Sequence, residues 1–324
     1  MSVRQPKGRK SPADVSVESD GTEMNWKKLG RLYAPATVHP KLSTHAANPL
    51  ALPLEGDVYR VFYSGRDTQN RSSVGFVEVD ILRREVVRQG EIPVFEHGPA
   101  GSFYSHGVSI GNCYEAGGQR YILFMGWQCP PGEHWRGDIG RLILNPDLTL
   151  QLDGNGPFMS TNEIDPVSLS YPWVIRGQND GYHMWYGSTI TWDGGNGEMV
   201  HVINHAASSN GHHWNRHGLA VPYKLGTAQA FSRPTVSGNR HDGYQMWFSY
   251  RSGRGEKYRI GYATSPDGNI WTLRLDEAGI TVSQSGWDSE MVEYPFVFNH
   301  KGQQYMLYNG NGHGRTGFGL AILE

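Results

Sequence analysis

The sequence has few cysteines, no long apolar run and no excess of charge of one sign. Only Cys113 and Cys129 occur among 324 residues. They lie too close in sequence, and in too strand-like a context, to suggest a disulfide framework, so we expect reduced thiols and a cytoplasmic location. No segment approaches the roughly 18 consecutive apolar residues of a membrane-spanning helix, and the N-terminal segment lacks the apolar region of a secretory signal. Lys and Arg number 29 against 31 Asp and Glu, so the broad positive field typical of nucleic-acid or anionic-membrane binding is missing. We therefore predict neither a nucleic-acid nor a membrane partner.

Motifs for metals and cofactors are also missing. There is no Cys-x-x-Cys pair and no helical His-x-x-x-His pair, and the adjacent His212 and His213 would point to opposite sides of a strand. The glycine-rich segment 309–319 lacks the strand, Gly-Lys-Ser/Thr and helix context of a phosphate-binding loop. We therefore expect no metal and no cofactor, and we interpret that segment as a hairpin turn.

Glycine and aromatic residues are abundant, with 42 Gly, 10 Trp and 17 Tyr. Many short strands joined by tight turns, with large rings between sheets, produce such a composition. The sequence therefore predicts an all-β protein rather than a helical bundle. Residues 1–23 are rich in Lys, Arg, Ser, Asp and Pro and predict a disordered tail, which leaves residues 24–324 as a single domain.

An internal repeat organises this domain. Five units, about 60 residues apart, each begin with a short apolar strand near Pro or Gly and continue with an aromatic second strand. The first strands are predicted at 46–52, 104–110, 169–175, 231–236 and 292–298, and the second strands at 56–67, 119–128, 181–188, 243–251 and 302–310. Fourth strands are predicted at 84–92, 148–154, 213–221, around Trp271 and, for the last unit, at 26–33.

This repeat predicts a five-bladed β-propeller with four-stranded blades, closed by the N-terminal strand 26–33. The alternatives are a β-sandwich, which explains five equal units poorly, and a β-helix, whose period is much shorter.

Three short motifs carry a resemblance to a known group of proteins. The Asn-Pro opening at 48–49, the segment YRVFYSGRD at 59–67 and the turn SPDGNIW at 265–271 resemble the propeller glycoside hydrolases, including families 43, 32 and 130. The resemblance covers residues 26–324 and implies a glycan-binding pocket at the end of the central channel. It also implies that Asn48, Arg66 and Asp67, which match family 130 positions, bind the substrate.

The catalytic carboxylates of these families are not matched. The positions that correspond to the acids of family 43 read Asn48, His106 and the pair Ser170–Tyr171, and the second-blade acid motif of family 130 is replaced by SFYSHGVS at 102–109. The chemistry of the relatives therefore does not transfer directly to this chain.

Equivalence of the five strand openings predicts a ring of polar side chains near the channel mouth. Its members are Asn48, His106, Tyr171, Arg233 and Glu293. Glu293 and His106 are candidates for acid and base catalysis. The guanidinium of Arg233 suits a carboxylate or phosphate, which favours an acidic sugar or sugar phosphate as ligand. Alternatively, Arg233 and Glu293 form a structural ion pair, His106 is structural, and the other two satisfy buried backbone groups.

Loop residues complete the predicted site. Asp165 is a third catalytic candidate, although an Asp before Pro also initiates turns. Asp288 and Trp287 precede the fifth unit, and Asn309 and Arg315 lie in the last turn, so all four are candidate substrate-binding residues. Asn311 and His313, in the same turn, are expected to border the pocket. Tryptophans in connecting loops, Trp127, Trp192 and Trp287, are candidates for stacking against sugar rings.

Three functions are compatible with the sequence. The first is an enzyme that hydrolyses or transfers a glycosyl group of a glycan or activated sugar. The second is a carbohydrate-binding propeller that has lost the catalytic acids. A cytosolic assembly factor that uses the flat face of the propeller is a third possibility. The oligomeric state, the sugar and the linkage stay open.

Overall fold

The structure is a computed structural model that describes residues 24–177 and 181–324. The predicted disordered tail, residues 1–23, lies outside the described residues. Within them there is no α-helix, only the 3₁₀ turns η1 (Pro40–Leu42) and η2 (Leu275–Glu277) among β-strands, so the predicted all-β class is confirmed. No helix of the described chain is long and apolar enough to cross a bilayer.

The strands pair antiparallel in consecutive sets. The first set is β2 (Thr44–Pro53), β3 (Val58–Arg66), β4 (Ser72–Asp80) and β5 (Glu85–Gln89). The second is β6 (Gly107–Ala116), β7 (Gln119–Gln128), β8 (Arg136–Leu144) and β9 (Leu150–Leu152). The third is β10 (Ser168–Arg176), β11 (Tyr182–Thr191), β12 (Val200–Ser208) and β13 (Asn215–Leu219).

The remaining strands continue the pattern. The fourth set is β14 (Ala230–Asn239), β15 (Gly243–Arg251), β16 (Arg259–Ser265) and β17 (Thr272–Leu273). The last is β18 (Glu293–His300), β19 (Gln303–Asn309), β20 (Phe318–Leu323) and the N-terminal strand β1 (Trp26–Tyr33), which pairs with β20 as expected. Single parallel bridges join β4 to β6 and β12 to β14, so the first two sets share one sheet and the next two share another.

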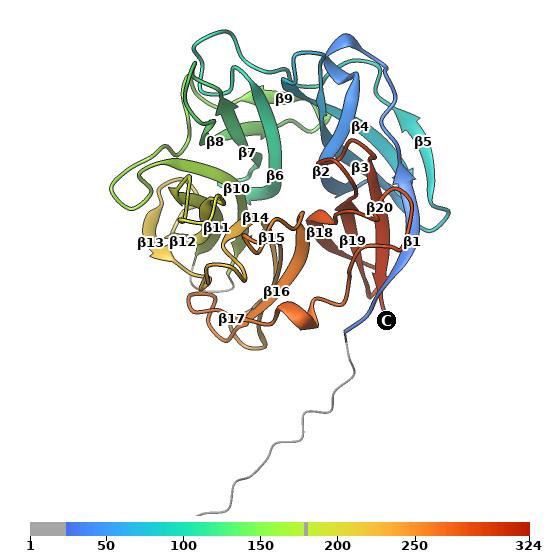
Figure 1. Cartoon of the computed structure of the whole chain (residues 1–324). Coiled ribbons are helices and arrows are strands. Elements are labelled where there is room, and N and C mark those ends of the chain that lie inside the picture. The colour runs from blue at the N-terminus through green and yellow to red at the C-terminus, as the bar shows by residue number, and fades with distance from the viewer. Residues whose placement is uncertain (1–23, 178–180) are drawn as a thin grey trace, which may run out of the picture.

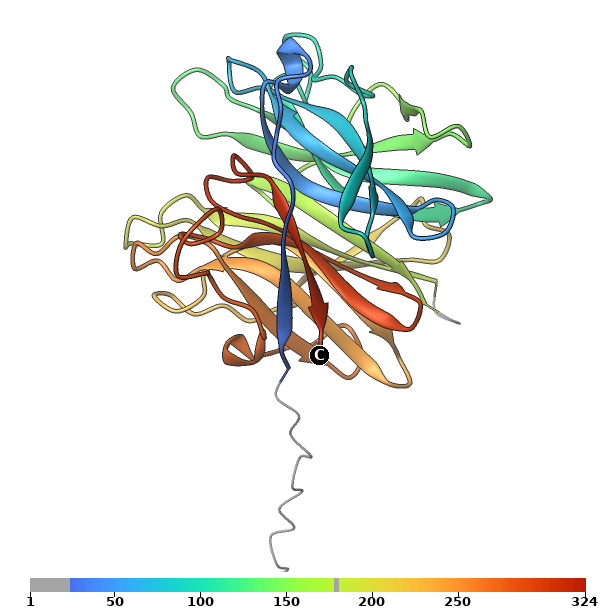
Figure 2. The same ribbon diagram turned by 90° about the vertical axis from the view of Figure 1, so that its right-hand side faces the viewer.

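The sheets surround a common centre, with the first strand of each set innermost (Figure 1). Each of these strands contacts the next along the chain, from β2 through β6, β10 and β14 to β18, and β18 contacts β2. Figure 2 shows β1 beside β20, near the C-terminus.

The innermost strands share a kink. In four of them a residue with positive φ directly precedes a proline, where the register shifts: Asn48 (φ 55°), Tyr171 (34°), Arg233 (45°) and Tyr294 (53°). In β6 the shift falls between Ile110 and Cys113. Two of these kink residues, Tyr171 and Tyr294, line the cavity described below.

Two members of the predicted ring therefore do not occupy equivalent positions. The fifth kink is formed by Tyr294, and Glu293 lies one residue before it. His106 precedes the first residue of β6 and lies before the second kink rather than in it. The reason is that β6 has no proline to mark its kink, and in the fifth unit Tyr, not Glu, adjoins the proline.

The predicted tight turn at 265–271 joins the third and fourth sets of strands through two tryptophans. The indole nitrogens of Trp185 and Trp271 both donate to the carbonyl oxygen of Gly268, each at 2.9 Å. Gly268 has a φ of 79°, a conformation that favours glycine. Because Trp185, Trp247 and Trp271 are all buried, these rings belong to the packing that supports the site.

Candidate functional site

A cavity of about 390 Å³ opens where the first strands begin and the second strands end. First strands contribute Ser109, Ser170, Tyr171, Phe231, Ser232 and Tyr294, and second strands contribute Arg66, Met125, Trp127 and Arg251. Connecting segments and β12 add Asn70, Cys129, Trp135, Met199, His201, Tyr258 and His313. We call this space the first cavity. Its size is that of a small-molecule site.

Two arginines, Arg66 and Arg251, line the first cavity. Arg66 donates to Asn70 Oδ1 at 2.7 Å, and Arg251 forms an ion pair with Glu198 at 2.7 Å. Arg251 also lies over the ring of Tyr258, at 4.8 Å from its centroid. None of the described residues that line the cavity is Asp or Glu. The arginines therefore face a space suited to an anionic group.

His313 lines the same cavity in front of a buried carboxylate. Its Nδ1 is 3.2 Å from Oε2 of Glu293, whose side chain is completely buried. The neighbouring carboxylate raises the pKa of His313. Burial raises the pKa of Glu293, opposed by His313, Arg66 and Arg251. His313 thus lines the cavity, and the buried carboxylate of Glu293 on its other side favours the protonated form of the imidazole.

An aromatic wall completes the first cavity. Trp135 meets Trp192 edge to face at 4.8 Å, and Trp192 stacks on His134 at 4.8 Å. Trp127 lies nearby in the lining, and its Nε1 donates to Ser72 Oγ at 3.1 Å. Because Trp192 is itself covered by two rings, Trp135 and Trp127 are the indoles that meet the cavity.

A buried, neutral histidine is part of the cavity lining. His201 is hydrogen-bonded to Ser170 Oγ at 2.6 Å and to Thr189 Oγ1 at 2.7 Å. Burial, together with Arg251, lowers the pKa of His201 to about 3. His201 is therefore an uncharged hydrogen-bonding group near neutral pH.

Four residues predicted for the site lie in or beside the cavity, and one lies at its rim. Arg66, Tyr171 and Trp127 line it, with Trp127 on β7 rather than in the predicted loop. The Tyr171 hydroxyl donates to that of Tyr294 at 3.3 Å. Glu293 lies behind His313. At the rim, His106 accepts a hydrogen bond at Nδ1 from the backbone of Cys129, which lines the cavity, at 3.2 Å.

Arg233 has a different setting from the predicted one. It is almost completely buried and donates to the carbonyl oxygens of Tyr294 at 2.8 Å and Pro49 at 2.7 Å, with Gly111 at 3.5 Å. These carbonyls belong to three other innermost strands. Burial lowers the pKa of Arg233 to about 9. Its guanidinium therefore joins the innermost strands, and neither the predicted ligand contact nor the alternative ion pair with Glu293 describes its position.

Asp165 and Asp288 also belong to the fold rather than to the cavity lining. Asp165 is buried and accepts from Tyr186 at 2.8 Å and from Arg216 at 2.9 Å. Asp288 repeats this arrangement in the last set, where Lys28 at 2.7 Å and the Tyr308 hydroxyl at 3.0 Å bind it. In both sets the tyrosine comes from the second strand and the cation from the fourth, so each aspartate ties the sheet together.

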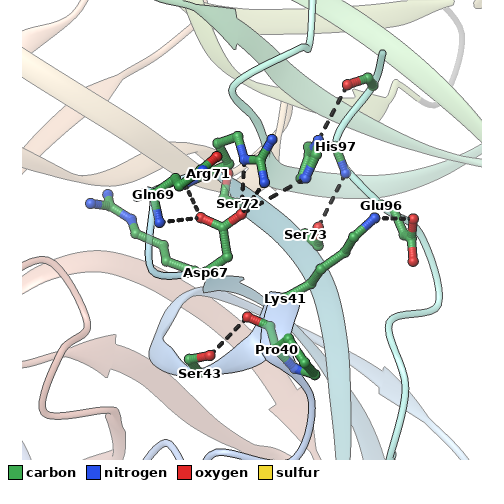
Figure 3. Close-up of polar contacts among 12 residues, drawn as sticks. Pro40, Lys41, Ser43, Asp67, Gln69, Arg71, Ser72, Ser73, Glu96 and His97 are labelled. Atoms are coloured by element: carbon green, nitrogen blue, oxygen red, sulfur yellow. Dashed lines mark hydrogen bonds and ion pairs between the residues drawn. The ribbon is translucent and has the colours of Figure 1, made fainter. Parts of the chain in front are cut away.

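The other predicted binding residues are engaged nearby. Asp67 accepts from the backbone of Gln69 and Arg71 and from the Arg71 guanidinium, and it stabilises its own loop (Figure 3). The buried Asn309 accepts from the backbone of Asn48 at 2.9 Å and donates to two carbonyl oxygens. The Asn48 side chain is buried outside the cavity lining.

Trp287 and Arg315 also lie outside the cavity lining. The ring of Trp287 packs on Tyr308, 5.2 Å between centroids. Arg315 is exposed in the turn after His313. Both residues therefore flank the segment that carries His313 rather than the cavity itself.

The sequence reasoning missed Arg251, Trp135 and His201 as site residues and treated His313 only as a border residue. One signal was present for Arg251, since it and Arg66 end the second strands of their sets. Aligning the repeats at the end of the second strand places Arg66 and Arg251 at matching positions. Trp135 follows an irregular loop, and no spacing marks it.

The solved structures share the fold. A glycoside hydrolase superposes with a TM-score of 0.71 at 15% identity, covering 93% of this chain and 92% of that chain. A glycosyl hydrolase from Bacteroides ovatus gives 0.66 at 14% identity, covering 92% and 93%. A third structure comes from the GH130 family of mannoside phosphorylases, which contains glycoside hydrolases that target β-1,2 mannosidic linkages in Candida mannan. It superposes with a TM-score of 0.68 at 13% identity, covering 94% of this chain and 95% of that chain. The predicted resemblance to propeller glycoside hydrolases is confirmed at the level of fold.

Sequence comparison gives a nearer relationship. No family model matches the chain. Two proteins of Mycobacterium tuberculosis, Uncharacterized protein MT1551 and Uncharacterized protein Rv1502, are each 43% identical over 306 residues, covering 93% of this chain and all of theirs. The chain therefore belongs to the same family as these two mycobacterial proteins.

Proposed function

We propose that residues 24–324 form one five-bladed β-propeller, closed by β1, that binds an anionic carbohydrate in the first cavity and hydrolyses or transfers its glycosyl group. Two observations support the propeller. Strands pair in consecutive sets of four, the last including β1. The innermost strands contact one another in order, with β18 returning to β2.

The ligand class follows from the charges around the cavity. Arg66, Arg251 and His313 line it, with no carboxylate among the described lining residues. A guanidinium binds a carboxylate or phosphate through paired hydrogen bonds. Trp127 and Trp135 offer flat apolar faces to the CH groups of a sugar ring. An acidic sugar or sugar phosphate can place its anionic group on the arginines and its ring on the tryptophans.

The single observation that carries the chemistry is the pair of His313 and Glu293, with an Nδ1 to Oε2 distance of 3.2 Å. His313 is the catalytic residue, because it meets the cavity, and Glu293 is a positioning residue. In the proposed step the bond between the anomeric carbon and the leaving oxygen breaks, and His313 donates its proton to that oxygen. Water or a sugar hydroxyl attacks the anomeric carbon, and its proton returns to the imidazole.

This proposal departs from the usual pair of exposed carboxylates in glycosidases. Glu293 is completely buried behind His313, and no carboxylate lines the first cavity among the described residues. Catalysis therefore depends on the raised pKa of His313, which favours the protonated imidazole that a general acid requires.

The test is a turnover assay with a panel of uronic-acid glycosides, sugar phosphates and nucleotide sugars. His313→Gln should lower kcat at least a hundredfold, because proton transfer of this kind contributes about 10²–10⁴-fold. Arg251→Gln should instead raise KM. His241→Gln is the control, since His241 is 91% exposed in its side chain. Unchanged turnover in His313→Gln would overturn the proposed chemistry.

The second candidate is a carbohydrate-binding protein without catalysis, favoured by the same absence of a carboxylate from the described cavity lining. Its signature is a sugar that binds wild type, loses affinity in Arg251→Gln and yields no product after long incubation. Product formation that depends on His313 excludes it.

A further inference from the structure

A second cavity, also of about 390 Å³, adjoins the first. Arg251, Tyr258 and His313 line both, so these three side chains form the partition between them. The rest of its lining is Glu198, Gly255, Glu256, Lys257, Glu290, Met291 and Gly312. His313, the candidate proton donor, thus lies between the two cavities.

The two cavities differ in charge. The described lining of the first holds no carboxylate, whereas three glutamates line the second. Glu198 pairs with Arg251, Glu290 pairs with Lys257, and Glu256 accepts from Ser252. With carboxylates largely balanced by cations, the second cavity offers hydrogen-bond acceptors to hydroxyl groups and opposes a further anion.

The partition is fixed to the second cavity by short contacts. Asn311 Oδ1 accepts from the backbone nitrogen of Glu290 at 2.8 Å and from that of Met291 at 3.2 Å. The backbone nitrogen of Gly312 approaches Met291 Sδ at 3.3 Å. The segment that carries His313 therefore keeps its position relative to both cavities.

From this geometry we infer that the ligand has two units joined at the partition. The anionic sugar occupies the first cavity, a neutral hydroxyl-rich unit occupies the second, and the bond between them lies at His313. This inference rests on the proposed function and deepens it, because it specifies the substrate as an anionic sugar linked to a neutral polyhydroxylated unit.

The test compares one-unit and two-unit ligands on the full chain. Calorimetric titration measures the affinity for two single units, glucuronic acid and mannose 6-phosphate. For each of them it also measures the affinity for the disaccharides in which one neutral hexose is attached to that unit. Comparing the affinities for the uronic acid and the sugar phosphate identifies which anion the protein prefers. Wild type should bind a disaccharide at least tenfold more tightly than its single unit.

Glu290→Arg places a long cation in the second cavity and should abolish that tenfold gain, leaving single-unit affinity within twofold. Glu277→Arg is the matched control, because both glutamates are 56% exposed in their side chains and each forms one ion pair. Equal affinity of wild type for one and two units, or equal loss of both in Glu290→Arg, would overturn the inference and leave the proposed function standing. If wild type binds none of these anionic sugars, the proposed function itself is refuted.

Discussion

Replacing Arg233 with methionine tests whether its guanidinium joins the innermost strands. The change removes two short hydrogen bonds, to the carbonyl oxygens of Tyr294 at 2.8 Å and Pro49 at 2.7 Å. Each buried carbonyl left unsatisfied costs about 1–3 kcal/mol, which gives a gross loss of about 2–6 kcal/mol. Methionine also removes the cost of burying a charge, which offsets part of that loss. We expect a net decrease of about 2–4 kcal/mol in the free energy of unfolding.

Urea denaturation followed by tryptophan fluorescence measures this decrease. Arg233→Lys should fall between wild type and Arg233→Met, because one ammonium keeps the charge but does not reproduce the guanidinium fork. Arg83→Met is the control, since the Arg83 side chain is 76% exposed, and it should shift stability by less than about 0.5 kcal/mol. A loss below about 1 kcal/mol in Arg233→Met would refute the structural role assigned to this residue.

Three further predictions concern the cavity and its support. Trp135→Ala should weaken sugar binding in calorimetry about tenfold, or about 1.4 kcal/mol; unchanged affinity would remove Trp135 from the site. Binding of an anionic sugar should weaken as the pH rises through the raised pKa of His313, because the imidazole is cationic below that pKa and neutral above it. In titrations of His313→Gln the pH dependence should flatten, and a persistent slope would assign it to another group. Asp165→Asn should lower stability by about 3–5 kcal/mol, because Arg216 loses its buried partner, while ligand affinity stays the same; a selective loss of affinity would return Asp165 to the site.

The repeat made much of the strand arrangement predictable. Each unit places aromatic residues in a second strand, and β7 (Gln119–Gln128) and β15 (Gly243–Arg251) have the predicted bounds. The pairing of Trp26–Tyr33 with the last strand followed from counting which unit lacked a fourth strand. Local periodicity determines such features, because they depend on residues close in sequence or on a missing partner.

The contacts that charged side chains make in the fold were not predictable in the same way. Arg233 and Tyr171 both precede a proline at a kink, yet Tyr171 lines the cavity and Arg233 binds carbonyls of three other strands. Asp165 and Asp288 look like turn or site residues in sequence, and only their tyrosine and cation partners, far along the chain, reveal a structural role. Such assignments depend on which distant strands become neighbours.

The most direct test of the proposed site is a crystal structure of the protein with an anionic sugar that it binds. We predict density in the first cavity, with the carboxylate or phosphate bound by Arg66 and Arg251 and a sugar oxygen within hydrogen-bond distance of His313. A sugar bound elsewhere on the protein, or one whose anionic group points away from both arginines, would contradict it.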